Sequence, residues 1–293
     1  MTNRPLLSHS ERGAGRPEGR KIAGPRVRLA AAAAILIGLS AGLLAHDFWI
    51  EPSTFSPRPD EVVRIQLRVG ERFAGESVAR NGAAIERFVA VGPSGEKPVF
   101  GRDGLDPAGL LRLDTAGLWQ IGYRSKPSPV VLPADRFEQY LRDEGLEYII
   151  EARAARGQSQ QPGREIFSRS VKSLLRAGAD AGAAGFDRAL GLTLEFVLEA
   201  DPAASGRTVP MRLLLEGKPL ARALVVAYRK DAGAAGAGAE KMRMRTDAQG
   251  RVTVAIEPGQ WLVKAVYMKG ADASTSADWE SVWTALTFEV PAR

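Results

Sequence analysis

Apolar and polar positions alternate through most of the chain after residue 60, a pattern that predicts β-strands. In residues 61–69 the apolar members fall on one face: Val63, Ile65, Leu67 and Val69. Shorter strands are expected at 85–91, 110–113 and 118–123, separated by turn formers such as Gly92-Pro93-Ser94-Gly95. Short strands at this spacing are typical of an antiparallel sandwich. We therefore expect residues 46–130 to form an N-terminal β-sandwich.

The same alternation returns in residues 189–293. It predicts strands at 192–199, 209–215, 222–229, 241–245, 251–256, 261–267 and 285–290. A tight turn at Asp247–Gly250 predicts a hairpin, and the Ala- and Gly-rich tip at 231–240 is expected to be mobile. This region is therefore predicted to be a second β-sandwich.

Residues 131–188 carry a helical period instead. Phe137, Tyr140 and Leu141 share one helical face, and Gly145 is placed to end that helix. Residues 164–176 also fit a helix, with an apolar stripe on one side. Its basic residues, expected on a solvated face, are Arg164, Arg169, Lys172 and Arg176. The predicted fold is mainly β: two antiparallel β-sandwich domains with a short helical insert, closed by a loop at 177–187.

The first 45 residues have the segment order of a secretory signal. Seven basic and two acidic residues come first, and an uncharged run from Leu29 to Ala45 follows. No pair of consecutive arginines precedes that run, so we expect export to the periplasm by the general secretory route. The alternative is an uncleaved anchor, for which 29–45 is short against a bilayer core of ~30 Å.

Cleavage after Ala45 would make His46 the first residue of the mature protein; cleavage after Ala41 or Gly42 stays open. An N-terminal histidine offers an α-amine and an imidazole to one metal ion. Copper(II) and nickel(II) prefer such nitrogen ligands, and Asp47 could add its carboxylate or its amide. The sequence therefore predicts a metal site at His46 and Asp47, with an ordinary polar strand start as the alternative.

Composition narrows the function further. The segment 1–45 holds much of the excess of 40 basic over 34 acidic residues, so the remainder is nearly neutral. Nucleic acid is not an expected partner, because it requires a concentrated basic surface. The absence of cysteine excludes thiolate metal sites and thiol catalysis. We expect no enzymatic activity and predict no small-molecule substrate.

Several motifs carry a resemblance to known families. The segment from Gly217-Lys218-Pro219 to Ala265 resembles carboxypeptidase-regulatory or transthyretin-like sandwiches. Over about residues 45–290, four motifs together resemble the bacterial DUF 4198 family. They are AHDFWIEP, FSRSVKSLL, LEFVLEADP and DWESVWTALTFEV. Members of that family are exported proteins associated with cobalt or nickel uptake, so the resemblance implies a membrane metal transporter as partner.

One position departs from the family pattern. The family's N-terminal histidine maps onto His46 and its following acidic residue onto Asp47, but Tyr267 stands where a second histidine is expected. A two-histidine brace of the kind used by copper oxygenases cannot be built from this mature chain. The expected function is to bind or present nickel, cobalt or copper as an accessory to uptake. The main alternative is a non-catalytic envelope module whose sandwich faces bind a protein or a glycan. The five tryptophans could line a sugar groove, but core or interface positions are expected for most of them.

Overall fold

The computed structural model describes residues 46–178, 181–182, 184–231 and 236–292, all within one compact unit. The signal predicted for 1–45 and residues 232–235 of the tip predicted at 231–240 lie outside these residues. Within the described part of the chain, no helix is both long enough and apolar enough to cross a membrane.

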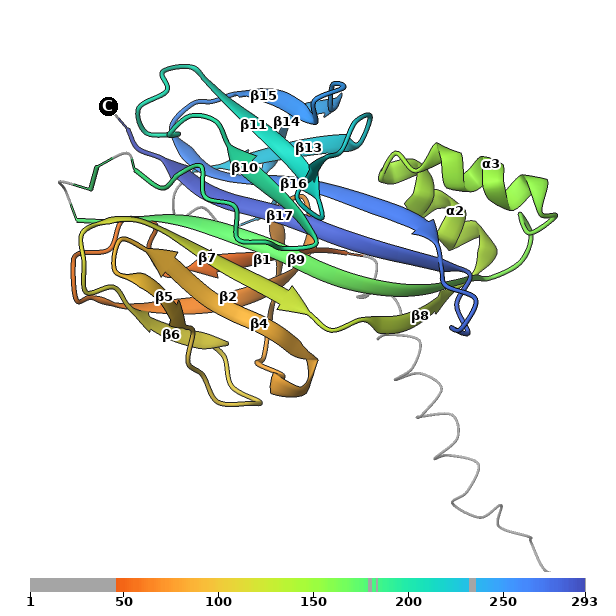
Figure 1. Cartoon of the computed structure of the whole chain (residues 1–293), viewed down its shortest axis with the longest axis horizontal. Helices are drawn as coiled ribbons and strands as arrows, with labels where there is room; N and C mark the ends of the chain where they lie inside the picture. Colours follow the sequence, from red (N-terminus) through yellow and green to blue (C-terminus); the bar gives the residue numbers. More distant parts are fainter. Residues whose placement is uncertain (1–45, 179–180, 183, 232–235, 293) are drawn as a thin grey trace, which may run out of the picture. The chain divides into compact units, whose positions relative to one another are not determined.

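A nine-stranded sheet forms the middle layer of the molecule (Figure 1). Its order from edge to edge is β14 (Ala239–Arg245), β13 (Leu224–Lys230), β16 (Gly259–Gly270), β17 (Trp279–Val290), β9 (Gly163–Ala177), β7 (Gly117–Ser125), β4 (Ile85–Gly92) and β5 (Gly95–Pro98). The ninth strand, β8 (Ser128–Leu132), also pairs with β9. Neighbouring strands are antiparallel except β17 and β9, which are parallel.

A four-stranded sheet covers each face of this central sheet. The N-terminal sheet contains β1 (Asp47–Pro52), β2 (Val62–Glu71), β3 (Ala74–Val78) and β6 (Gly109–Arg112). The C-terminal sheet contains β10 (Leu194–Leu198), β11 (Thr208–Leu215), β12 (Lys218–Pro219) and β15 (Arg251–Ala255). A short 3-10 turn, η1 (Gly82–Ala84), precedes β4.

Each covering sheet makes its own core with the central sheet. In β7, Trp119 and Ile121 pack in the core beneath the N-terminal sheet, whereas Leu118 packs in the core beneath the C-terminal sheet. This follows from the pleat, which sends successive side chains to opposite faces. The mainly β fold built from sandwiches is confirmed, and the two sandwich cores share one sheet between them.

Two helices cover one end of the central sheet. The predicted helix is α2 (Ala134–Asp143), and it buries Phe137, Tyr140 and Leu141 as expected. Gly145 adopts φ +69° just after it, a backbone conformation that favours glycine. The second helix, α3 (Glu147–Ala155), follows at once. A Cβ at Gly163 would lie 2.2 Å from the Phe137 ring, so glycine lets α2 approach β9 this closely.

The helix expected at 164–176 is wrong, because this segment is the strand β9. Both faces of β9 are covered, so apolar residues stand at odd and even positions alike. Val171 packs under the N-terminal sheet and Leu174 under the C-terminal sheet. In such a strand apolar and polar residues no longer alternate, and its apolar residues can fall at spacings typical of one face of a helix. The strand that the sequence did not predict is a central one, since β9 pairs with both β7 and β17.

The basic residues of β9 do not form one solvated face. Lys172 is buried, and Arg169 lies between the rings of Phe48 and Phe167, 4.7 and 4.8 Å from their centroids. Burial lowers the pKa of Arg169 to about 10. At the ends of the strand, Arg164 and Arg176 pair with aspartates. Each basic side chain therefore has its own local partner.

Candidate metal site at His46

His46 is the first described residue and lies immediately before β1. Asp47 pairs with Gly70 in the antiparallel ladder of β1 and β2, which places His46 opposite Glu71. The imidazole Nε2 lies 3.0 Å from Glu71 Oε1. The other ring nitrogen, Nδ1, is buried and has no hydrogen-bond partner among the described residues. Because Nε2 donates to the carboxylate, the lone pair of the neutral ring is on Nδ1.

The Asp47 side chain has a partner inside the protein. Its carboxylate accepts a hydrogen bond from Lys264 on β16, and the same ammonium donates to Glu144 Oε1 at 2.7 Å. Successive residues of a strand point to opposite sides, so the carboxylate of Asp47 faces away from the His46 ring. That Asp47 supplies a metal ligand stays a prediction.

Lys264 joins three distant segments: the start of β1, the end of α2 and the middle of β16. All three ionised groups of this triad are buried. Burial alone would lower the pKa of Lys264, but the charges of Glu144 and Asp47 raise it above its ordinary value. Burial, with the negative charge of Asp47, raises the pKa of Glu144. The triad holds the start of β1 beside His46 to α2 and β16, and no sequence pattern predicts it.

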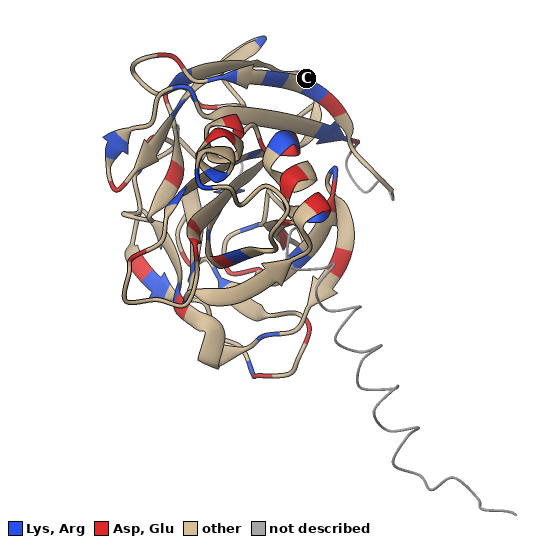
Figure 2. Cartoon of the chain, turned by 90° about the vertical axis from the view of Figure 1, so that its right-hand side faces the viewer, with Lys and Arg blue, Asp and Glu red and all other residues tan. Residues whose placement is uncertain are grey.

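Tyr267 lies on the opposite face of β16 from Lys264. It packs against the core under the C-terminal sheet and lines a surface groove of about 450 Å³. The groove runs along α3, where Glu147 and Tyr148 line it, with Arg245 across from them. Figure 2 shows charges of both signs on the helices at this end of the molecule. A side chain at 267 therefore does not share the face on which Lys264 holds Asp47.

A second buried acid lies beneath α2. Glu165 on β9 accepts hydrogen bonds from Tyr140 and Ser281, the former at 3.2 Å. Burial raises the pKa of Glu165 to about 7, although both hydrogen bonds favour its ionised form. Perturbed carboxyl groups of this kind are common at functional sites, and structural networks produce them too. In this protein the acid links a helix to the sheet.

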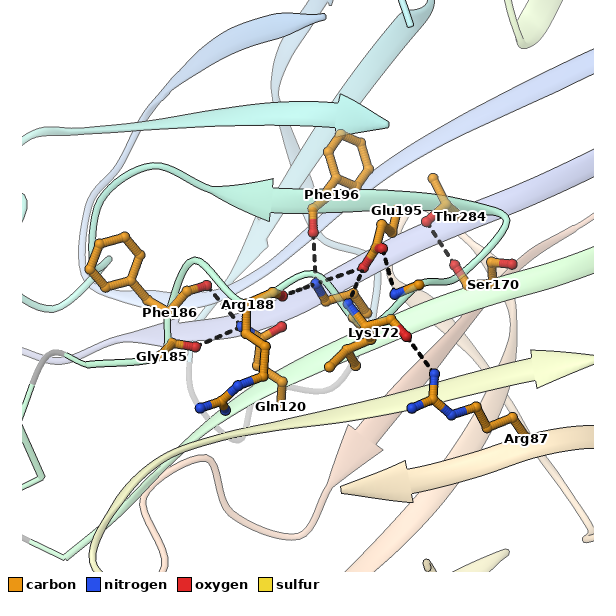
Figure 3. Close-up of polar contacts among 12 residues, drawn as sticks. Arg87, Gln120, Ser170, Lys172, Gly185, Phe186, Arg188, Glu195, Phe196 and Thr284 are labelled. Carbon is orange, nitrogen blue, oxygen red and sulfur yellow. Dashed lines mark hydrogen bonds and ion pairs between the residues drawn. The ribbon is translucent and has the colours of Figure 1, made fainter. Parts of the chain in front are cut away.

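A third buried cluster centres on Lys172, on the other face of the central sheet (Figure 3). Its ammonium donates to Arg188 O, Glu195 Oε2 and Phe196 O, at 3.0, 3.2 and 2.9 Å. Glu195 also accepts the backbone N–H groups of Leu190 and Gly191. Three donors of the lysine meet three acceptors, which describes a structural tie from β9 to β10 and to the segment before β10.

Gln120 and Arg87 hold the same segment from neighbouring strands. Gln120 donates to the carbonyl groups of Gly185 and Phe186, both at 2.8 Å, and Arg87 donates to Leu190 O. Burial lowers the pKa of Lys172, with Glu195 opposing part of that effect. The sequence did not predict this network, because residues 164–176 were expected to form a helix and the loop that Lys172 holds has no periodic pattern.

The five tryptophans all belong to the cores: Trp49, Trp119, Trp261, Trp279 and Trp283. Each is at most 5% exposed. Buried indole rings cannot stack on a sugar at the surface, so the aromatic groove considered for a glycan is not formed by these residues.

Comparison with known families identifies the chain. The model of a domain of unknown function, DUF4198, matches residues 43–269, most of the sequence and most of both sandwich cores. The chain belongs to the DUF4198 family. This confirms the resemblance drawn from the sequence motifs. The family description assigns no activity.

Other comparisons add little about this DUF4198 protein. No curated protein matches it. Among solved structures, the D0-D1 domain of intimin is 11% identical and covers 83% of this chain and 98% of its own, with a TM-score of 0.19. A TM-score this low carries no argument about fold or function. Within the described residues, no group of three or more His, Cys, Asp or Glu side chains is arranged to hold a metal ion.

Proposed function

We propose that this DUF4198 protein is exported to the periplasm and there binds a divalent transition metal through its mature N-terminal histidine. The ion is cargo, which the protein presents to a membrane transporter as an accessory to uptake. Nickel, cobalt and copper are the candidates, because amine and imidazole nitrogens suit these ions. The role is binding rather than catalysis.

The observation that supports this proposal is the state of the His46 ring. An α-amine and the Nδ1 atom of the same histidine close a six-membered chelate ring with a metal, whereas Nε2 points away from that ring. Nδ1 is the nitrogen without a partner among the described residues, and Nε2 is the one bonded to Glu71. This arrangement supports chelation, because a neutral ring whose Nε2 donates to Glu71 leaves Nδ1 without a competing hydrogen bond.

The small number of ligands also favours a carrier. His46 supplies two nitrogens, and the Asp47 carboxylate is held by Lys264. A site with few protein ligands leaves coordination positions for water or for groups of a receiving protein, which eases transfer. A site built for permanent retention would be closed by side chains, as structural zinc sites are.

Native mass spectrometry of the protein exported by a bacterial host tests the proposal. The intact mass shows whether the chain begins at His46, and growth with trace nickel, cobalt and copper shows which ion is bound. We expect one ion per chain, lost in His46→Ala and lost when one glycine is inserted ahead of His46. The insertion keeps the imidazole and removes only the free amine beside it.

Asn81→Ala, which changes an N-cap far from His46 in the sequence, serves as the matched control and should keep the metal. A chain that begins elsewhere, or that begins at His46 and stays free of metal, would contradict the proposal. Binding that survives the glycine insertion would point to a site without the amine.

A further inference from the structure

Large apolar side chains gather at one corner of the N-terminal sheet. Seven such side chains are exposed among the described residues, and four of them lie at this corner: Val62, Phe100, Leu105 and Leu110, at 53%, 71%, 50% and 48% exposed. We call these four residues the apolar corner. Scattered exposed apolar residues are normal, whereas a cluster of them calls for an explanation.

Strand pairing brings the corner together. Leu110 on β6 pairs with Arg64 on β2, and Val62 pairs with Arg112 two residues along the same ladder, on the same face of the sheet. On its other side, Leu110 forms a β-bridge with Phe100. Leu105 belongs to the loop that joins Phe100 to β6. The ladder thus places Val62 beside residues that lie far away from it in the chain.

These side chains cannot turn inward, because the residues that alternate with them along the strands already fill the core. Val63, Ile65 and Leu111 are buried under the same sheet, at 0%, 0% and 3% exposed. Alternation along β2 and β6 then directs their neighbours outward. The corner therefore stays on the surface as long as the N-terminal sheet keeps its register.

Arginines alternate with the apolar residues on this surface. Arg64 and Arg102 are exposed and make no ion pair within the described residues. The acids nearby have partners of their own: Asp60 pairs with Arg112 at 3.3 Å, Glu61 with Arg58 at 3.8 Å and Asp103 with Arg80 at 3.6 Å, and Asp106 accepts from the Gln66 amide at 3.2 Å. The corner thus presents apolar side chains among guanidinium groups that are free to meet an external anion.

We infer that the apolar corner docks the protein on an anionic phospholipid surface. Phe100, the most exposed of the four, would enter the acyl boundary together with Leu110. Arg64 and Arg102 would bond lipid phosphates, as expected at a membrane interface. Protruding apolar side chains suit a fluid surface that deforms around them. The inference does not depend on the metal site.

Vesicle flotation tests the inference with the protein as exported, its intact mass showing that every variant starts at the same residue. We expect binding to vesicles of equal parts phosphatidylglycerol and phosphatidylcholine, and much weaker binding to phosphatidylcholine alone. The double variant Phe100→Ser, Leu110→Ser should weaken binding at least about tenfold. Val131→Ser, which removes an apolar side chain that is 58% exposed on β8, is its matched control and should bind like the wild type.

A second pair of variants tests the charges. Arg64→Gln with Arg102→Gln should weaken binding about fivefold for each arginine, and only at low salt. The double variant Arg136→Gln, Arg207→Gln removes two other exposed arginines and should change it little. Urea unfolding of each variant verifies its fold.

Three results would overturn the inference. The wild type could fail to bind anionic vesicles, or binding could survive the change of Phe100 and Leu110. Thirdly, sedimentation velocity could show that the wild type is a dimer and the double variant Phe100→Ser, Leu110→Ser a monomer, while the wild type does not bind vesicles. That result would make the corner a contact between copies of the chain.

Discussion

The two buried lysines of the central sheet lie on opposite faces and differ in their electrostatics. Lys172 meets one carboxylate and two carbonyl groups, and burial lowers its pKa. Lys264 meets two carboxylates, and its pKa is raised although it is also buried. Burial is common to both, so the number of facing carboxylates sets the direction of the shift.

The two networks also differ in what they hold. The Lys172 network ties β10 and the loop before it to the central sheet, within one sandwich. The Lys264 triad joins the strand beside the proposed metal site to the end of α2, over 217 residues of sequence on one side and 120 on the other. Such a triad stabilises the fold only while both acids keep the lysine as their partner, because a buried carboxylate without a cation is strongly destabilising.

The largest difference between the two networks should appear when the ammonium group of each lysine is removed. Lys264→Met leaves two buried carboxylates facing each other and should lower the free energy of unfolding by about 3–5 kcal/mol. Lys172→Met leaves one carboxylate that still accepts two backbone N–H groups, so its loss should be smaller, roughly 2–3 kcal/mol. Urea unfolding followed by tryptophan fluorescence measures both.

The pH dependence provides the control for that pair. Burial and the charge of Asp47 raise the pKa of Glu144, so its protonation should remove the repulsion between the two acids, and the deficit of Lys264→Met should shrink as the pH falls. Equal losses in the two lysine variants, or a deficit in Lys264→Met that does not change with pH, would refute the assignment of the raised pKa to two facing acids.

Glu165 extends the comparison to a buried acid that forms no ion pair with any described residue. Its pKa of about 7 in the folded protein exceeds the ordinary 4.5, so the folded state binds the proton more tightly than the unfolded state. Stability should therefore be highest below 4.5 and should fall as pH rises toward about 7, by on the order of 3 kcal/mol.

Glu165→Gln should abolish most of this decline, while its amide oxygen still accepts from Tyr140 and Ser281. Urea unfolding across this pH range gives the slope, and Glu280→Gln, which breaks the surface ion pair with Lys269, is the control. A decline that persists in Glu165→Gln would assign the titration to another group.

The contact between Glu71 and His46 lies between the buried and the exposed ion pairs, because the Glu71 side chain is 73% exposed whereas the His46 side chain is 29% exposed. Glu71→Ala should weaken metal binding about tenfold, since Nδ1 would lose its fixed orientation. Glu71→Gln should stay close to the wild type, because the amide oxygen still accepts from Nε2. Isothermal titration with copper, nickel and cobalt distinguishes the two variants. Equal affinity in all three proteins would remove Glu71 from the site.

The smallest effect is expected at the exposed ion pair of Arg245 and Glu147, 2.6 Å apart with side chains 41% and 55% exposed. Glu147→Gln should cost about 0.5 kcal/mol and less at high salt. Urea unfolding at two salt concentrations measures this reference for the buried pairs. A loss as large as that of Lys172→Met would show that burial does not decide how much an ion pair contributes to stability.

Much of the fold was readable from the sequence wherever one side of an element faces solvent. Strands β2, β11 and β15 alternate because one face is buried, and α2 shows its helical face because it lies on the surface of the sheet. The family was readable too, since its motifs span both sandwich cores. These features are local, and a periodic pattern records them.

Only the tertiary structure decided the rest. β9 is buried on both faces, so its composition carries no period that distinguishes a strand from a helix. His46 was a candidate from its position after an apolar run. Glu71 as the partner of its Nε2, and Lys264 as the partner of Asp47, come from pairing between distant strands. Side chains brought together from distant segments leave no spacing in the sequence, because each is placed by the packing of the whole sheet.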